Sequence, residues 1–283
     1  MKFSINQTEL QNALGTVLKG TSSKSTLPIL SGIFIEAKED SLIFQATNLD
    51  LSIQYQAKAL VEEPGKTVLP GKLFFDIVKS MNDAAVHITT NDEGAAIICD
   101  SSSFMIRTLD PNDFPSFPKV EILQKISVPF ETFTSMIKKV SKAASKDESK
   151  PALTGINVTL EDGTLSMVTT DSYRLALASA AVKNDNAENF QAVISSVFMA
   201  DIASLPKTAD DLTLALTENQ IVVTYQDTVF INRKIEGAYP AYKRIIPTSY
   251  VTRIRVSRQQ LISAARRASL LGNAGVSVKF EVD

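Results

Sequence analysis

The chain has 283 residues, of which 44% are hydrophobic and 21% charged, and its 29 Lys and Arg nearly balance its 31 Asp and Glu. This composition is typical of globular proteins and excludes a disordered or membrane-embedded chain. The opening MKFSINQTEL lacks the apolar region of a secretory signal peptide, so we expect a cytoplasmic protein. The length suggests about two domains, because single cores stop growing beyond roughly 250–300 residues.

The scarcity of two residue types limits the chemistry. Cys99 is the single cysteine, which excludes an intramolecular disulfide and a Cys-rich zinc site. His87 is the single histidine, which excludes a two-His metal motif, and its alternating surroundings are typical of a strand. Composition alone therefore leaves a carboxylate-based active site open.

The predicted elements begin with an alternating segment at Phe3 and Ile5, followed by a helix that Gly20 is placed to end. The apolar residues of this helix recur with helical spacing and are Leu10, Ala13, Leu14 and Val17. Further elements are strands at 29–36, 41–47 and 50–60, a helix at 72–81, and strands near 84–90, 95–99 and 103–109. The second helix has the apolar set Phe75, Ile77, Val78 and Met81.

This series of elements occurs twice. Sliding the chain by 123 positions aligns identical residues, namely Lys2/Lys125, Ser4/Ser127, Val17/Val140, Lys19/Lys142, Gly32/Gly155, Ile33/Ile156, Leu42/Leu165 and Thr47/Thr170. After a two-residue insertion the offset is 125, with the pairs Asp76/Asp201, Ile77/Ile202, Ile106/Ile231 and Pro115/Pro240. Each repeat has two halves of strand, helix and three strands. This pattern predicts an α+β fold, with helices on one face of largely antiparallel sheet.

A third copy begins near residue 252. Its helical spacing is carried by Val256, Leu261, Ala265 and Ala268, and an alternating, strand-like set follows at Val276, Val278, Phe280 and Val282. Proline-rich segments mark both boundaries between copies. We therefore predict domains at 1–120 and 121–248, and the start of an incomplete third domain at 249–283.

Short segments spread over the whole chain carry a further signal. They are MKF at 1–3, TLPIL at 26–30, FFDI at 74–77 after Pro70, DFP at 113–115, TTD at 169–171, RLA at 174–176, and EG at 236–237 followed by Pro240, Tyr242, Arg244 and Pro247. In order and spacing they resemble the bacterial replicative sliding clamps, the beta subunits of DNA polymerase III. The resemblance implies a non-catalytic processivity factor of three domains per subunit, with no catalytic residue, no metal and no cofactor. Two such subunits close head to tail around duplex DNA and tether the polymerase alpha subunit, the clamp loader and other clamp-motif proteins.

The resemblance also assigns basic residues on and beside the helices to a wall that faces DNA phosphates. These are Lys24, Lys72, Lys79, Lys138, Lys139, Lys142, Lys146, Arg266 and Arg267, and Lys19 and Arg258 belong to the same basic set. The alternative for any one of them is an ordinary solvated helix surface.

Two further sites follow from the resemblance. A pocket for partner peptides is expected at Leu153, Thr170, Ser172, Tyr173, Arg174, Leu175, Pro240, Arg244 and Ile245. Its second wall would come from residues that this chain does not have, so weakened peptide binding is expected. A subunit junction is expected between Phe104 and Ile106 on one side and Leu270 and Leu271 on the other. Ordinary core packing is the alternative for the apolar members of both sets.

Two other functions stay open at this point. One is a peptide-binding adaptor that does not close a ring. The other is a Mg²⁺-dependent nucleic-acid enzyme that uses Asp76, Asp171 and Asp201 as carboxylate ligands. Asp76 and Asp201 occupy equivalent positions in the two repeats, which favours an architectural role over one asymmetric active site.

Overall fold

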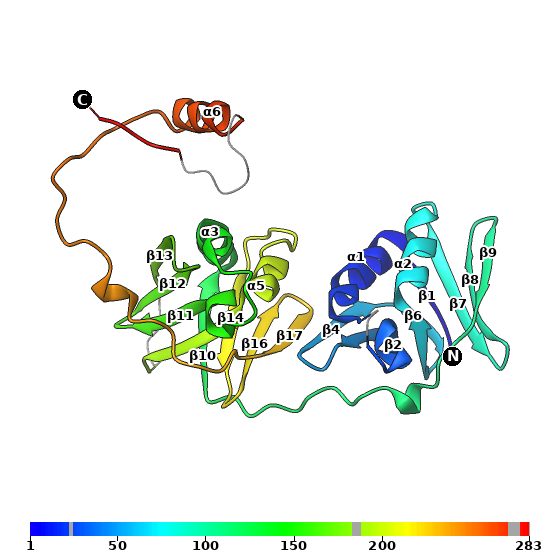
Figure 1. The fold of residues 1–283 in the computed structure, drawn as a ribbon. Helices are drawn as coiled ribbons and strands as arrows, with labels where there is room; N and C mark the ends of the chain where they lie inside the picture. The colour runs from blue at the N-terminus through cyan, green and yellow to red at the C-terminus, as the bar shows by residue number, and fades with distance from the viewer. Residues whose placement is uncertain (23–24, 183–187, 271–277, 283) are drawn as a thin grey trace. The chain divides into compact units, whose positions relative to one another are not determined.

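The computed structural model describes residues 1–22, 25–182, 188–270 and 278–282 (Figure 1). It divides into two compact units, Met1–Tyr239 and Pro240–Asp283. The first unit contains the first predicted domain and residues 121–239 of the second, and the second unit contains residues 240–248 together with the segment predicted to begin a third.

The first repeat consists of β1 (Lys2–Asn6), α1 (Gln7–Val17), β2 (Gly32–Lys38), β3 (Ser41–Thr47), β4 (Leu51–Lys58), β5 (Leu60–Glu63), β6 (Gly65–Pro70), α2 (Gly71–Ser80), β7 (Ala85–Asn91), β8 (Gly94–Cys99) and β9 (Ser102–Ile106). The second consists of β10 (Gln124–Pro129), α3 (Phe130–Val140), α4 (Pro151–Thr154), β11 (Gly155–Glu161), β12 (Thr164–Thr170), β13 (Leu175–Ala181), β14 (Phe190–Ser195), α5 (Ser196–Ile202), β15 (Asp211–Leu216), β16 (Gln220–Tyr225) and β17 (Thr228–Arg233). The predicted α+β fold of strand, helix and three strands per half is confirmed.

Three predicted strands differ from the observed ones. The strand expected at 29–36 begins only at Gly32, because Pro28 starts a 3-10 turn that runs to Ser31. The strand expected at 50–60 is divided into β4 and β5, since the chain passes there from one sheet to another. The strand expected at 103–109 ends at Ile106, and Leu109 forms only an isolated bridge with Val68.

The strands of the first unit form three sheets with antiparallel pairing throughout the described residues. Their orders are β5-β1-β7-β8-β9, β10-β15-β16-β17-β4-β3-β2-β6 and β13-β12-β11-β14. The eight-stranded sheet combines both repeats, because β17 of the second repeat pairs with β4 of the first. This pairing, which we call the joint, explains why two repeats fold as one compact unit.

The helices pack their apolar faces on these sheets. In α1 the predicted set Leu10, Ala13, Leu14 and Val17 is fully buried. In α2 the prediction included Phe75, but the fully buried aromatic residue is Phe74, and Phe75 is only half-buried. A single hydrophobic core runs through both repeats, from Phe3 in β1 to Phe230 in β17.

Strand register corrects the repeat alignment in the last strands. Ile97 lies opposite Phe104 in the β8–β9 pair, and Val223 lies opposite Phe230 in the β16–β17 pair. Phe104 is therefore equivalent to Phe230, at an offset of 126, and Ile106 is equivalent to Asn232 rather than to Ile231. A shift of one residue places a side chain on the opposite face of a strand, so the correction decides which residues are comparable.

Gly32 and Gly155, identical in the sequence repeat, occupy the same crowded position. A Cβ atom on Gly32 would lie 2.4 Å from Cγ1 of Val68, and one on Gly155 would lie 2.5 Å from Cγ1 of Val193. Each glycine therefore allows the close approach of the neighbouring strand, β6 in the first repeat and β14 in the second.

The segment between the repeats is anchored to the first unit along its length. The Leu109 amide donates to the Val68 carbonyl at 2.8 Å, and Phe114 stacks on Phe34 with ring centroids 5.4 Å apart. Further along, Phe117 and Val120 pack against a small apolar cluster on the eight-stranded sheet, formed by Ala215, Val222 and Ile231. The two repeats are thus connected by a linker that packs on the eight-stranded sheet, as well as by the joint.

The second unit contains the helix α6 (Arg258–Ser269), in which no residue is buried. The alternating set predicted as a strand is not one in residues 278–282, because a strand requires a neighbouring strand and the described part of this unit has none. Val276 lies outside the described residues. No helix among the described residues is long and apolar enough to cross a membrane.

Candidate functional site

Six of the predicted DNA-facing lysines, all in the described part of the first unit, are exposed: Lys72, Lys79, Lys138, Lys139, Lys142 and Lys146. Lys72 and Lys79 lie on α2, where Lys72 forms a 2.6 Å ion pair with Asp76 and the Lys79 ammonium lies 6.0 Å from the centre of the Phe75 ring. Lys138 and Lys139 lie in the last turn of α3, a position that also suits the helix dipole. These residues present positive charge to solvent on two different helices.

A groove between α3 and α5 brings two lysines together. It encloses about 380 Å³ and is lined by Lys138, Lys207, Ser141 and Ser204, among other residues. Lys207 follows α5 and forms a 3.5 Å contact with Glu131. Lys207 is not among the basic residues predicted from the sequence, because it lies after Pro206, outside any helical pattern. Ammonium and hydroxyl groups side by side are suited to bind a phosphate oxygen.

The remaining basic candidates lie in several places. Lys142 and Lys146 are exposed in the segment after α3, and Arg266 and Arg267 are exposed on α6. Lys24 lies outside the described residues. Lys19 instead belongs to the joint, where its ammonium lies 3.5 Å from the Asp201 carboxylate and donates to the Ser204 hydroxyl.

The candidate peptide pocket centres on the turn between β12 and β13. The Asp171 carboxylate accepts the amides of Tyr173 and Arg174 at 3.1 and 3.0 Å, and the Arg174 guanidinium donates to it at 3.0 Å. The Arg174 amide is the leading cause that lowers the pKa of Asp171 below its usual range. Thr170 donates to the Arg174 carbonyl, and Ser172 adopts a positive φ of 75°. The turn is therefore rigid.

Apolar candidates surround this turn. Leu153 is buried on α4, Leu175 is half-buried at the start of β13, and Tyr173 is 97% exposed. The Arg174 guanidinium also donates to the Lys142 carbonyl at 2.9 Å, which fixes the segment after α3 beside the turn. The structure thus places six of the nine predicted pocket residues on neighbouring segments of the first unit. Pro240, Arg244 and Ile245 belong to the second unit, where all three are exposed.

The carboxylates of the candidate enzyme are engaged in structural contacts. Asp76 pairs with Lys72, Asp201 pairs with Lys19, and Asp171 holds its own turn. In the described parts of the chain, no group of three or more His, Cys, Asp or Glu residues could hold a metal ion. His87 lies on β7, with Nδ1 2.7 Å from the Ser4 hydroxyl, and burial raises the pKa of the Cys99 thiol.

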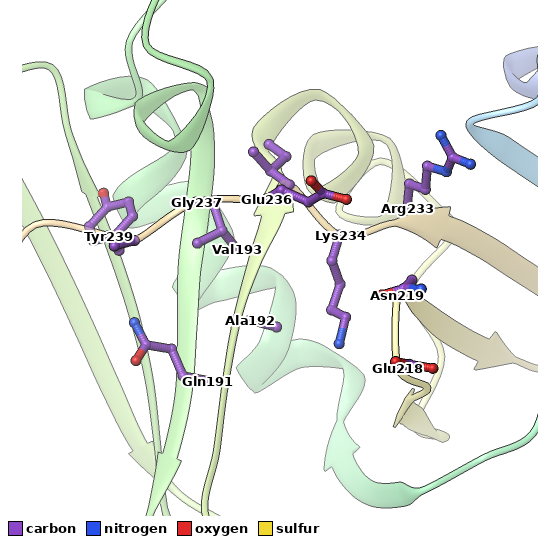
Figure 2. Close-up of a pocket in the computed structure, with 12 residues that line it drawn as sticks. Gln191, Ala192, Val193, Glu218, Asn219, Arg233, Lys234, Glu236, Gly237 and Tyr239 are labelled. Carbon is purple, nitrogen blue, oxygen red and sulfur yellow. The ribbon is translucent and has the colours of Figure 1, made fainter.

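A separate cavity of about 520 Å³ lies beside β14 and the segment after β17 (Figure 2). Figure 2 shows Gln191 and Val193 on one wall and Lys234 and Glu236 on the other. The Lys234 ammonium donates to the Thr217 carbonyl at 2.9 Å, and the cavity lining combines both signs of charge. Glu236 and Gly237 of the EG segment line this cavity, but none of the residues predicted to bind DNA, a peptide or a second subunit does.

The predicted junction residues differ in exposure. Phe104 is 38% exposed on β9, the last strand of the five-stranded sheet, whereas Ile106 on the same face is buried. Leu270 is exposed at the end of α6. Leu271 lies outside the described residues.

Comparisons with known proteins agree over nearly the whole chain. The family models for the DNA polymerase III beta subunit match its N-terminal domain at residues 1–118 and its central domain at residues 127–241. The beta sliding clamp of Staphylococcus epidermidis is 32% identical over 97% of this chain and 75% of the relative, and that of Bacillus subtilis is 30% identical over the same shares.

Solved structures give the same result. The crystal structure of the DNA polymerase sliding clamp from Bacillus subtilis has a TM-score of 0.91 at 30% identity and covers 98% of this chain and 75% of that one. The DNA polymerase III beta subunit from Thermotoga maritima has a TM-score of 0.90 at 26% identity, covering 97% and 75%. The chain therefore spans about three quarters of the length of these relatives.

Proposed function

This chain belongs to the family of bacterial DNA polymerase III beta subunits, the beta sliding clamps, and on that premise we propose that it holds a polymerase on duplex DNA as a processivity factor. The observation that carries the proposal is the tandem match of two family domains, which together span most of the first unit. Membership of this family confirms the predicted role of a non-catalytic accessory subunit. The site of action is the cytoplasm, on the nucleoid.

DNA contact is assigned to the exposed basic residues of the helices and the segments that follow them. Phosphate contacts from lysine and arginine give affinity without reading sequence, which suits a protein that slides along DNA. The groove between α3 and α5 supports this assignment, because Lys138 and Lys207 line it together with two hydroxyl groups. Lys24, Lys72, Lys79, Lys139, Lys142, Lys146, Arg266 and Arg267 complete the set.

A triple charge reversal tests the assignment of this DNA-facing surface. Lys24→Glu, Lys138→Glu and Lys142→Glu together are expected to weaken DNA binding and to reduce the slope of log K against log salt by about 0.9 for each phosphate that is no longer neutralised. The matched control reverses three exposed lysines that lie in strands, Lys38, Lys58 and Lys125. Equal salt slopes for the two triple variants and the unmodified chain would overturn the assignment.

Partner tethering is assigned to the candidate pocket residues at the β12–β13 turn, and the resemblance names Pro240, Arg244 and Ile245 for the same role. A rigid turn next to the aliphatic side chains of Leu153 and Leu175 suits a short extended peptide with apolar anchors. Tyr173, almost fully exposed, is available to cover such a peptide.

Calorimetry with a synthetic clamp-motif peptide tests the pocket. Tyr173→Ala is expected to weaken the peptide about tenfold, since an aromatic contact of this kind contributes about 1–2 kcal/mol. Tyr250→Ala, at another exposed tyrosine in the second unit, is the matched control and should leave affinity unchanged. Equal affinities of both variants and the unmodified chain would remove Tyr173 from the pocket.

Head-to-tail association of subunits is assigned to β9 through Phe104 and Ile106. The resemblance names Leu270 and Leu271 for the opposite half, and the exposure of Phe104 and Leu270 supports an unfilled contact at both places.

A further inference from the structure

Two asparagines of the second repeat are buried and incompletely hydrogen-bonded. Asn157 of β11 is 0% exposed, and Asn232 of β17 is 7% exposed. The Asn157 nitrogen Nδ2 and the Asn232 oxygen Oδ1 are the two buried side-chain atoms without a hydrogen-bond partner in the part of the chain that the structure describes. An unpaired buried polar atom lowers the stability of a fold, so its presence requires an explanation.

The first repeat has apolar residues at both equivalent positions. Phe34 is equivalent to Asn157 by the register of the β2–β6 and β11–β14 pairs. Ile106 is equivalent to Asn232 by the register of the β8–β9 and β16–β17 pairs. Phe34 and Ile106 are 9% and 6% exposed, so both positions belong to the interior in either repeat. The fold itself therefore does not require asparagine at these two places.

Asn157 lies directly behind the wall of the cavity shown in Figure 2. In the first repeat, the Phe34 ring stacks on the Phe114 ring, with centroids 5.4 Å apart. In the second repeat, the Gln191 side-chain nitrogen donates to Asn157 Oδ1 at 2.8 Å. Gln191 and Tyr239 both line the cavity of about 520 Å³. A polar wall beside a cavity thus stands where the first repeat has a stacked aromatic pair.

Asn232 lines a second cavity, of about 440 Å³, at the joint. Its side-chain nitrogen donates to the Asp50 carbonyl at 3.2 Å, which leaves the acceptor Oδ1 without a donor. The two cavities share Arg233, Lys234 and Ile235 in their linings. They therefore adjoin along this segment, with one incompletely bonded asparagine at each.

The two unpaired atoms require a ligand with both kinds of hydrogen-bonding group. Asn157 Nδ2 is a donor and Asn232 Oδ1 is an acceptor. An anion would satisfy only the first, and a metal ion or an ammonium group only the second. Peptide backbone offers a carbonyl and an amide in every residue, about 3.3 Å apart along an extended chain. The cavity lining carries both signs of charge, which also suits a neutral, dipolar backbone.

We propose that the two cavities form a docking site for an extended peptide segment of a partner protein, which lies across Arg233–Ile235. One backbone amide of the peptide donates to Asn232 Oδ1. One backbone carbonyl accepts from Asn157 Nδ2 once the exposed Gln191 side chain has turned aside. No residue of the candidate pocket at the β12–β13 turn lines either cavity, so this site is separate from the one in the proposed function.

Thermal unfolding tests whether the two atoms are unpaired in the free protein. Asn157→Leu and Asn232→Leu are each expected to raise the melting temperature by about 2–4 °C, because leucine has a similar size and removes the unpaired atom. Thr134→Val is the matched control at a buried residue whose hydroxyl is bonded, to the Glu131 carbonyl at 3.2 Å, and should give no increase. A lower melting temperature for both asparagine variants would overturn the inference.

Peptide selection tests the docking itself. A phage-displayed library of random linear peptides is selected on the unmodified chain, with counter-selection on the double variant Asn157→Leu/Asn232→Leu. By calorimetry, the recovered peptides should bind the double variant about tenfold or more weakly than the unmodified chain, because two backbone hydrogen bonds are lost. They should bind Tyr173→Ala as tightly as the unmodified chain, since Tyr173 belongs to the candidate pocket.

A pair of surface variants tests the site without a change in the core. Gln191→Trp fills the first cavity from an exposed position and should abolish binding of the recovered peptides, whereas Gln56→Trp, at an exposed glutamine of β4, should leave it unchanged. The inference is overturned if no peptide survives counter-selection or if Gln191→Trp binds normally. It is also overturned if Tyr173→Ala abolishes binding, because the peptides then occupy the pocket of the proposed function.

Discussion

The joint and the β9 edge are two copies of one structural unit in different surroundings. In the joint, β17 has a neighbouring strand, and Phe198 and Phe230 are sealed from solvent. At the edge, the equivalent residues Leu73 and Phe104 are exposed, although their strand and helix are built in the same way. The repeat therefore fixes the local elements, and the presence of a neighbouring strand decides which apolar residues are core.

The largest difference between the two places concerns the aromatic pair. Phe230→Ala should lower the free energy of unfolding by about 3–5 kcal/mol, because it removes a fully buried ring and leaves a cavity. Phe104→Ala should cost about 1 kcal/mol or less in dilute, dissociated protein, because a half-open site loses little burial. Urea unfolding followed by circular dichroism measures both, and equal losses would contradict the comparison.

A smaller difference is expected for the equivalent lysines. Lys19→Met should lower the free energy of unfolding by about 1 kcal/mol, since its partly buried ammonium holds Asp201 and Ser204 across the joint. Lys142→Met should change it by less than about 0.5 kcal/mol, as expected for an exposed surface lysine that forms no ion pair with any described residue. The same unfolding measurement applies, and a larger loss for Lys142→Met would reverse the assignment of the two sites.

The smallest expected difference is between the equivalent β3–β4 and β12–β13 turns, and it concerns how the stability of each turn depends on pH. Asn48 caps the β3–β4 turn with its neutral amide, accepting the Asp50 and Leu51 amides at 3.1 and 2.8 Å. Asp171 caps the β12–β13 turn with a carboxylate whose pKa is lowered, chiefly by the Arg174 amide. A lowered pKa means that the cap is fully present above the unfolded pKa of aspartate and is lost as pH falls through the folded pKa.

Hydrogen exchange, corrected for the intrinsic pH dependence of amide exchange, should therefore show lower protection factors for the Tyr173 and Arg174 amides in acid, with no such change at Asp50 and Leu51. Asp171→Asn should remove this pH dependence, because the asparagine side chain does not titrate in this range. If protection from exchange falls equally in both turns at low pH, protonation of the Asp171 carboxylate is not the cause of the loss.

Much of the fold could be predicted from the sequence, because regular apolar spacing determines which face of a helix packs. The α1 set and the repeat identity Gly32/Gly155 are examples, and the glycine pair has a steric cause. Two details were not predictable from the sequence. One is that Phe74 rather than Phe75 is the buried aromatic residue of α2, and the other is that Ile106 is equivalent to Asn232 rather than to Ile231. Adjacent aromatic residues satisfy a helical pattern almost equally, and a short strand without identities can be aligned in either register.

The candidate site was less accessible to prediction. A lysine that pairs across the joint, as Lys19 does, has the same sequence pattern as one that faces solvent, such as Lys142. Lys207 reaches the groove between α3 and α5 only through tertiary packing. The Asp171 turn was predictable as a motif, whereas its engagement with the Lys142 carbonyl depends on the fold.

The central claim, that this chain acts as a DNA clamp, is tested most directly by retention on DNA of different topology. Protein assembled with the clamp loader of its source on a nicked circular plasmid should remain bound during gel filtration and be released once the plasmid is cut at one site, because a ring slides off a free end. Equal retention on circular and linear DNA, or release from both at the same rate, would contradict the account and leave a peptide-binding adaptor as the function.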